Sequence, residues 1–166
     1  MTTEEVGEIV TTADAPTLFL CYWKQPQLTD AIRLGRWIRT RDLAVRDPDG
    51  YYWYRGRNDD LIKSAGYRIG PVEVEEVLMR HAAVAEAAVI GVPDPQRGQL
   101  VQACIVPAAG HVGSDDLVDA LREHVRQALG PYKVPRRLIF LDQLPHTTTG
   151  KVSRAQLRRQ FGDAAP

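Results

Sequence analysis

The sequence predicts an α+β fold, in which a small sheet of about three strands packs with two helices. In the second half of the chain, stretches with helical spacing of apolar residues alternate with short apolar runs. One helical stretch has clear boundary signals, since Ser114 suits an N-cap and Gly130 suits the residue after a helix end. A composition of 44% hydrophobic and 25% charged residues over 166 residues is typical of a globular chain.

Residues 1–56 are predicted to be mainly β segments. Residues 7–10 are strand-like, an apolar run covers residues 16–23, and a short helical turn is expected at residues 28–33. These pieces have no obvious partner of their own. We therefore interpret them as the edge of a structure whose remainder lies elsewhere.

Residues 39–57 are predicted to form a hairpin. Residues 47–50 read Asp-Pro-Asp-Gly, which is the composition of a type I turn. We place a domain boundary at the end of this hairpin, so that residues 57–166 form a second domain.

Residues 55–76 concentrate glycines, arginines, a lysine and two adjacent aspartates in a short span. The pattern predicts two short strands around a glycine turn, followed by a helix that a proline opens. Arg57, Lys63 and Arg68 would then lie on or beside tight turns, where cationic side chains can converge on an anion. From the residues alone, a phosphate or carboxylate site and a charged surface hairpin are both open.

The remaining elements follow from apolar spacing and from proline and glycine positions. Pro93 is expected to end the first long strand. His81, at the end of a helix, is interpreted as compensating the helix dipole rather than as a base. The expected ranges are a helix at 72–81, strands at 84–92, 100–106 and 137–141, and a terminal helix at 157–161.

A polar, threonine-rich loop at residues 144–154 carries Lys151 directly after a glycine. It is not a Walker A loop, because it lacks that motif's first glycine and the Ser or Thr after the lysine. Taken alone, Lys151 would be an exposed surface lysine.

Composition narrows the function classes. Lys+Arg and Asp+Glu both total 21, so no overall charge favours nucleic acid or an anionic membrane. Cys21 and Cys104 are far apart and the four histidines are scattered, so neither a disulfide framework nor a metal site is expected. No apolar run approaches the roughly 20 residues of a membrane span, and the N-terminus lacks a signal-peptide pattern. We expect a cytoplasmic protein.

Two motifs resemble those of a known family. Residues 56–75 read Gly-Arg-x-Asp-Asp-x-Ile-Lys-x-x-Gly-Tyr-Arg-Ile-x-Pro-x-Glu-Val-Glu, and residues 145–154 read Pro-x-Thr-x-x-Gly-Lys-x-x-Arg. Both are similar to signatures of the adenylate-forming superfamily, which includes acyl-CoA synthetases, adenylation domains of peptide synthetases, and luciferases. The similarity is strongest to medium-chain acyl-CoA synthetases. It implies that residues 57–166 are the C-terminal lid domain and residues 1–56 the distal end of the large N-terminal domain.

The resemblance also implies roles for single residues in the ATP-dependent step. Asp42 and Arg57 would contact the ribose of ATP or AMP, and Arg68 the phosphates. Lys151 would be catalytic, bridging the substrate carboxylate and the α-phosphate. Asp59 would be the hinge about which the lid turns.

A second set would act in thioester formation with coenzyme A. Lys63 would face the site in this conformation, and Gly66 would leave room for the pantetheine arm. An Arg97 that pairs with a carboxylate is an open alternative to coenzyme A binding. The implied coenzyme A contacts are Ala65, Gly66, Tyr67, Arg97, Val134, Pro135 and Arg136.

Two departures from the family pattern bear on activity. Arg41 stands where the family carries a glycine before the ribose-binding aspartate, and arginine would be strained if that glycine needs a positive φ. The phosphate-binding loop and the acyl pocket are not in this sequence. The chain alone is therefore expected to be inactive, with Mg and ATP held mainly by a separate N-terminal adenylation domain.

Three functions stay open. The chain is part of an acid–CoA ligase that uses a carboxylic acid, ATP and coenzyme A; or it is a non-catalytic nucleotide- or coenzyme A-binding module; or it is a domain that docks on a partner. The residues present do not identify the acid.

Overall fold

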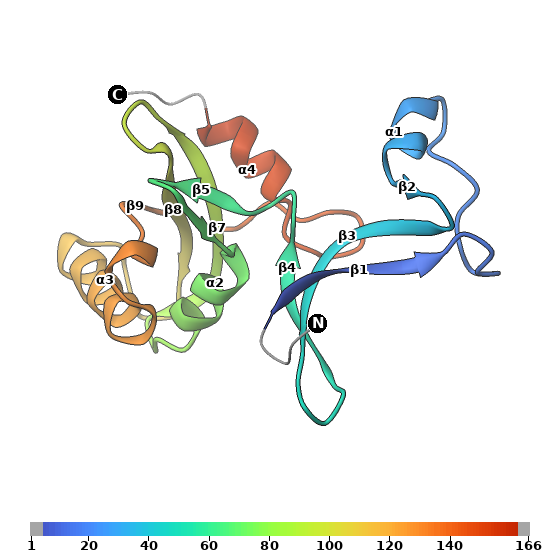
Figure 1. Ribbon diagram of the computed structural model, residues 1–166. Helices are drawn as coiled ribbons and strands as arrows, with labels where there is room; N and C mark the ends of the chain where they lie inside the picture. The colour runs from blue at the N-terminus through green and yellow to red at the C-terminus, as the bar shows by residue number, and fades with distance from the viewer. Residues whose placement is uncertain (1–4, 163–166) are drawn as a thin grey trace. The chain divides into compact units, whose positions relative to one another are not determined.

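The computed structural model describes residues 5–162 and divides into two compact units, the first ending at Asp59 and the second beginning at Asp60 (Figure 1). The predicted boundary lay between residues 56 and 57. Asn58 N–H donates to the Arg41 carbonyl oxygen at 2.8 Å, so residues directly after the hairpin contact the first unit.

The first unit is a four-stranded antiparallel sheet in the order β1-β3-β2, with β4 also paired to β3. The predicted hairpin is confirmed, and Gly50 N–H closes its turn by donating to the Asp47 carbonyl oxygen at 3.1 Å. Its elements are β1 (Val6–Thr12), α1 (Pro26–Ala31), β2 (Arg33–Leu34), β3 (Trp37–Arg46) and β4 (Tyr52–Arg57).

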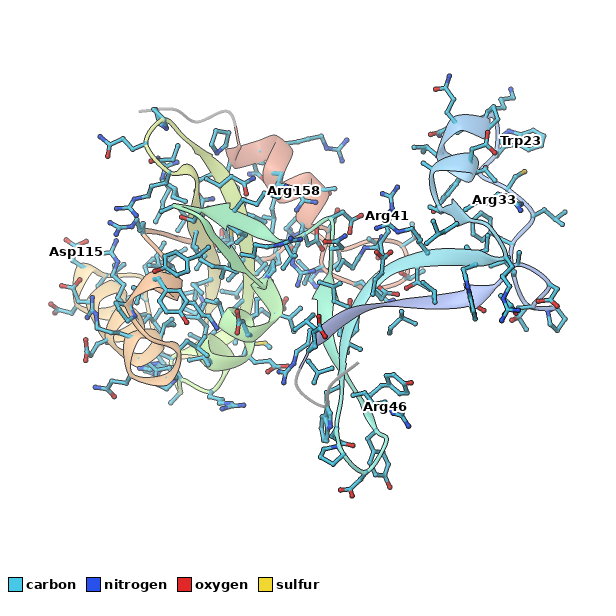
Figure 2. The ribbon with its side chains drawn as sticks, in the orientation of Figure 1. Trp23, Arg33, Arg41, Arg46, Asp115 and Arg158 are labelled. Atoms are coloured by element: carbon cyan, nitrogen blue, oxygen red, sulfur yellow. The ribbon has the colours of Figure 1, made fainter. Side chains whose placement is uncertain are left out.

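The apolar run at residues 16–23 forms no strand, and much of it faces solvent. Leu20 is 90% exposed and Trp23 is 81% exposed, with the Trp23 ring projecting away from the ribbon (Figure 2). The hydrophobic residues buried in this unit are few: Ile32, Ile38, Leu43 and Ala44.

The second unit confirms the α+β prediction. Its sheet has five strands in the order β6-β5-β8-β7, with β9 parallel to β8. The predicted hairpin β5–β6 joins this sheet through the pairing of Ser64 with Gly98. The elements are β5 (Ile62–Ser64), β6 (Tyr67–Ile69), α2 (Pro71–Met79), β7 (Val84–Asp94), β8 (Gly98–Pro107), α3 (Asp115–Leu129), the short 3-10 helix η1 (Pro131–Lys133), β9 (Arg137–Phe140) and α4 (Arg154–Phe161).

Helices cover both faces of this sheet (Figure 1). On one face, α2 and α3 bury Leu78 and Leu121 against the strands. On the other face, α4 buries Leu157 against residues that include Ile90 and Cys104. Because strand side chains alternate between faces, one sheet supplies two separate hydrophobic clusters.

The helix boundaries follow their predicted signals. The Ser114 hydroxyl accepts from Leu117 N–H at 3.2 Å at the start of α3, and Gly130 with φ of 85° follows its end. At α2, Pro71 occupies the first turn and Glu73 accepts from Gly70 N–H at 3.3 Å. These contacts satisfy amide groups that a helix start leaves without partners.

The prediction that Pro93 ends its strand is wrong, because β7 continues to Asp94 and Pro93 pairs with Gln99. β7 pairs only with β8 among the described strands. At such an edge, a residue without an N–H leaves no partner unsatisfied. Among residues 5–162, no helix has the length and apolar character needed to cross a membrane.

Candidate functional site

The β3–β4 hairpin brings three predicted site residues together in the first unit. Arg57 Nη1 lies 3.3 Å from Asp42 Oδ1, and Arg57 Nε lies 2.9 Å from Asp59 Oδ1. Burial acts to raise the pKa of Asp59, but hydrogen bonds and charge from Arg57, with a smaller contribution from Arg41, hold that pKa below its usual value. Asp59 is therefore a carboxylate at neutral pH, with its orientation set by Arg57.

Arg41 has a φ of 65°, in the left-handed region that favours glycine. Its N–H donates to Glu8 Oε1 at 3.0 Å and its carbonyl oxygen accepts from Asn58 N–H at 2.8 Å, so both sides of the strained residue are fixed. Its guanidinium lies 3.7 Å from Asp59 Oδ2 (Figure 2). Residue 41 thus has the positive φ at which an arginine, unlike a glycine, is strained.

In the second unit, the β5–β6 hairpin places two predicted cations side by side. Lys63 and Arg68 are directly opposite each other across the strand pair, and both are exposed. Their neighbours Ile62 and Ile69 are the opposite pair that faces the core. The two cations therefore lie on the same face of the hairpin.

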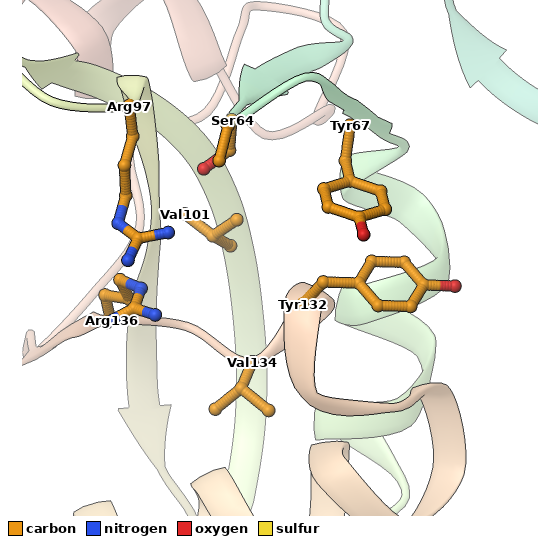
Figure 3. Close-up of a pocket in the computed structure, with 8 residues that line it drawn as sticks. Ser64, Tyr67, Arg97, Val101, Tyr132, Val134 and Arg136 are labelled. Atoms are coloured by element: carbon orange, nitrogen blue, oxygen red, sulfur yellow. The ribbon is translucent and has the colours of Figure 1, made fainter.

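A small pocket of about 50 Å³ opens in the second unit (Figure 3). It is formed where the loop between β5 and β6, the β7–β8 turn and the segment from η1 to β9 meet. Its lining residues are Ser64, Ala65, Tyr67, Arg97, Val101, Tyr132, Val134 and Arg136.

Two arginines give this pocket positive charge. The guanidinium groups of Arg97 and Arg136 lie close together on the same side of the pocket (Figure 3). Within residues 5–162, neither forms an ion pair. The alternative of an Arg97 paired with a carboxylate thus finds no such partner in the described part of the chain. Arg97 is instead fixed through its backbone, since its N–H donates to Asp94 Oδ1 at 2.8 Å.

Two tyrosine rings form the other side of the pocket. Tyr67 and Tyr132 stack with centroids 4.6 Å apart and an interplanar angle of 17° (Figure 3). Sequence reasoning missed Tyr132, together with Ser64 and Val101. For Tyr132 a signal existed, because it lies two residues before the predicted stretch at 134–136.

Two predicted coenzyme A contacts do not line this pocket. Pro135 is buried beside it, and Gly66 lies in the β5–β6 turn. A Cβ at Gly66 would meet no other atom of the chain within 4 Å, and the φ of 86° lies in the region that favours glycine.

Lys151 lies in a hydrogen-bonded turn rather than a loose loop. Thr147 N–H donates to the Lys151 carbonyl oxygen at 2.7 Å, and Gly150 N–H donates to the Thr147 carbonyl oxygen at 2.9 Å. The Lys151 side chain is exposed and forms no ion pair within residues 5–162. A fixed turn thus presents an ammonium group to solvent.

The second unit also matches a family of known proteins. Residues 73–151 match the family model of the AMP-binding enzyme C-terminal domain. This part of the chain belongs to that family. No group of three or more His, Cys, Asp or Glu side chains able to hold a metal ion occurs among residues 5–162 of the protein.

Curated relatives that match most of the chain include acyl-CoA synthetases and CoA ligases. The chain is 48% identical over 145 residues to the mitochondrial acyl-coenzyme A synthetase ACSM5 of Rattus norvegicus, a match that covers 86% of this chain and 25% of that protein. It is 47% identical over 143 residues to 4-hydroxybutyrate–CoA ligase 1 of Metallosphaera sedula, with 86% and 25% covered. The chain therefore spans about a quarter of the length of these relatives.

Solved structures show the same fold. The anthranilate CoA ligase AuaEII, in complex with anthranoyl-AMP, superposes with a TM-score of 0.83 and 36% identity over 96% of this chain and 31% of that one. In the second unit, Ala65, Tyr67, Arg97, Val134 and Arg136 meet at one pocket. Lys151 belongs to the same unit but does not line that pocket.

Proposed function

We propose that the chain acts as the C-terminal lid of an AMP-forming acid–CoA ligase. In the first step a carboxylate oxygen attacks the α-phosphorus of ATP, and the bond to pyrophosphate breaks. In the second step the sulfur of coenzyme A attacks the acyl carbonyl, its proton is lost, and AMP leaves. The family of residues 73–151 and the ligase relatives support this assignment.

The pocket in the second unit is the observation that carries the proposal. Five residues named from the sequence as coenzyme A contacts come from three separate segments and converge on it. Two of them are arginines without an ion-pair partner among the described residues. Guanidinium groups bind phosphate oxygens bidentately, so the phosphates of coenzyme A would complete the pairing that Arg97 and Arg136 lack.

Lys151 would serve the first step. The attacking carboxylate and the α-phosphate repel each other, and an ammonium group between them stabilises the transition state as charge builds up on the phosphorus oxygens. An exposed lysine on a hydrogen-bonded turn fits this role, because the turn fixes where the flexible side chain starts.

Asp42 and Arg57 would hold the ribose, Arg68 the phosphates, and Asp59 would be the hinge. A carboxylate can accept two hydrogen bonds from the vicinal hydroxyls of a ribose. The Arg57 contacts orient both Asp42 and Asp59 in the free chain. Lys63 would replace Lys151 at the reaction centre once the lid has turned.

A calorimetric titration tests the coenzyme A site directly. The chain alone should bind coenzyme A, and Arg97→Ala should weaken binding by about tenfold because a charge-assisted contact is lost. Arg159→Ala, an exposed arginine on α4, is the matched control. Equal affinity of Arg97→Ala and Arg159→Ala for coenzyme A would contradict the proposal that this pocket binds coenzyme A.

A second experiment tests catalysis with a co-expressed large adenylation domain. Acid-dependent AMP formation is expected only when both parts are present. Lys151→Ala should slow adenylation by about 10²-fold or more. It should spare thioester formation from supplied acyl-adenylate, and an equal loss in both half-reactions would contradict the role.

One alternative has an observation in its favour. The pocket lies entirely within the second unit, so coenzyme A binding does not need the ribose-binding residues of the first. Together with the strained Arg41, this favours a non-catalytic coenzyme A-binding module. Coenzyme A binding by the chain without turnover in any reconstituted mixture would select that function.

A further inference from the structure

Four charged side chains form a partly buried ion cluster in the second unit, here called the α4 cluster: Asp60, Glu75, Arg154 and Arg158. Arg154 Nε donates to Glu75 Oε1 at 3.0 Å, and its second terminal nitrogen contacts Glu75 Oε2. Arg154 Nη1 lies 3.4 Å from Asp60 Oδ2, and Arg158 Nη1 lies 3.0 Å from Asp60 Oδ1. The side chains of Asp60, Glu75 and Arg154 are 13%, 9% and 22% exposed, so these contacts are shielded from water.

The cluster connects three elements of the unit. Asp60 precedes β5, Glu75 lies on α2, and the two arginines lie on α4 (Figure 2 labels Arg158). Glu75 also accepts from Val89 N–H on β7 at 2.7 Å, so its carboxylate is fixed from two sides. Arg154 uses its forked guanidinium to bridge two carboxylates, which a point charge could not do with the same geometry.

Arg154 is only three residues after Lys151 and is the first residue of α4. Between them, Ser153 N–H donates to the Pro145 carbonyl oxygen at 2.7 Å, and His146 pairs with Val152. These bonds close the base of the turn that presents Lys151. A residue that fixes the start of α4 therefore fixes one end of that turn.

Asp60 is the other end of the connection. It directly follows Asp59 and begins the second unit. Its carboxylate contacts both α4 arginines, so the residue next to the proposed hinge is joined through Arg154 to the base of the lysine turn. The connection from Asp60 to the lysine turn thus consists of ion pairs and does not involve the strands of the sheet.

We propose that Arg154 is a positioning residue for Lys151 and that Asp60 links this residue to the hinge, so that the lysine turn moves with the lid as one rigid piece. This inference rests on the proposed function, because it assigns Arg154 to the reaction that Lys151 would serve. Arg154 itself touches neither substrate nor nucleotide in this role.

The first test uses the chain itself and needs no turnover. Trypsin cleavage after Lys151 requires the turn to open locally, so its rate reports how firmly the turn is held. Arg154→Met should raise this cleavage rate by about tenfold under conditions where the chain stays folded, and Arg154→Lys should restore part of the protection by keeping one ion pair. Arg159→Met, from the exposed face of the same helix, should leave the rate unchanged.

Cleavage products are identified by mass spectrometry, and a thermal melt of each variant reports global stability. Faster cleavage after Lys151 in Arg154→Met than in Arg159→Met, well below the melting transition, is the expected result. Equal rates in the two variants would overturn the proposal. If Arg154→Met does not fold, Asp60→Asn is used instead, because it removes only the contacts of the α4 cluster with Asp60. Its rate of cleavage after Lys151 is compared with that of Arg159→Met, and equal rates would overturn the proposal.

The second test separates this inference from the function on which it rests. In the reconstituted ligase, Arg154→Lys should slow adenylation more than thioester formation from supplied acyl-adenylate, while Arg159→Lys should change neither. If Lys151→Ala leaves adenylation unchanged, the proposed function fails. If Lys151→Ala abolishes adenylation but Arg154→Lys changes neither half-reaction, only the positioning role fails.

Discussion

Arg41 shows how one residue can hold a conformation that its own chemistry disfavours. For a residue with a Cβ, the left-handed region costs about 1–2 kcal/mol, and here Arg41 is held there by donating its N–H to Glu8 and by accepting at its carbonyl oxygen from Asn58 N–H. The ion pair with Asp59 at 3.7 Å offsets little of that cost, because it is partly exposed. The strained residue is adjacent in sequence to Asp42, which is proposed to contact the nucleotide, and it pairs with Asp59, which is proposed to form the hinge.

We predict that Arg41→Gly is more stable than Arg41→Ala by about 1 kcal/mol, because only glycine adopts this φ without a Cβ clash. Both variants lose the guanidinium, so their difference isolates the backbone effect. Urea unfolding measures it. An alanine variant as stable as the glycine variant would show that residue 41 leaves the left-handed region.

His81 gives a prediction about pH, and it corrects the sequence interpretation. Burial, followed by the nearby charges of His124 and His111, lowers the pKa of His81 below its ordinary value of 6.5. Its Nδ1 accepts from Ala83 N–H at 3.2 Å, which requires that nitrogen to be unprotonated. The neutral ring does not compensate the helix dipole as we expected.

Because the folded-state pKa is lowered, the unfolded chain binds the proton more tightly. The contribution of His81 to stability is therefore complete above pH 6.5 and is lost as the pH falls through the lower folded value. The free energy of unfolding, measured above and below pH 6.5, should decrease less in His81→Asn than in the unaltered chain. The same decrease in both would assign the pH dependence to other groups.

At the scale of elements, the α4 cluster joins α4 to α2 and to Asp60 through ion pairs. Removing one partner of a buried ion pair leaves the other charge without compensation, which is more costly than the pair itself is favourable. Glu75 accepts hydrogen bonds from Arg154 and from the Val89 amide, so its loss removes a partner from both groups, and Arg154 keeps only its contact with Asp60 among the ion pairs of the α4 cluster.

We predict that Glu75→Ala lowers the free energy of unfolding by about 3 kcal/mol. Glu76→Ala, on the exposed face of the same helix, should change it by less than about 0.5 kcal/mol. Chemical denaturation followed by circular dichroism provides the comparison. Similar values for the two variants would mean that water enters the cluster and compensates the charges.

At the scale of the whole molecule, the two units differ in how much core they contain. Most buried hydrophobic residues belong to the second unit, whose sheet has helices on both faces. Strand β1 in the first unit has no buried residue. Local stability follows buried apolar contacts, so the first unit is expected to open more readily.

Hydrogen exchange should therefore distinguish the units. The amides at the centre of β7 and β8, such as Val89 and Ala103, are expected to exchange most slowly. The amides of β1 should exchange markedly faster. Equal protection in β1 and β7 would mean that the first unit is stabilised by a partner or by self-association that covers its exposed apolar residues.

Much of the second unit was determined by local sequence. The cap at Ser114, the proline at Pro71 and the apolar stripe that buries Leu121 and Val125 act over a few residues, and each predicted element formed. The turn composition at residues 47–50 likewise determined the hairpin of the first unit. Such signals are readable because capping and turn geometry depend on neighbours along the chain.

What only the tertiary structure decided depends on residues far apart in sequence. The stacking of Tyr132 on Tyr67, the two arginines on one side of the pocket and the contacts of Arg154 with Asp60 and Glu75 join segments that no local pattern relates. The continuation of β7 through Pro93 was equally hidden, because it depends on which strand lies at the sheet edge. Spacing along the chain determines the elements, and the packing of those elements determines which charges meet.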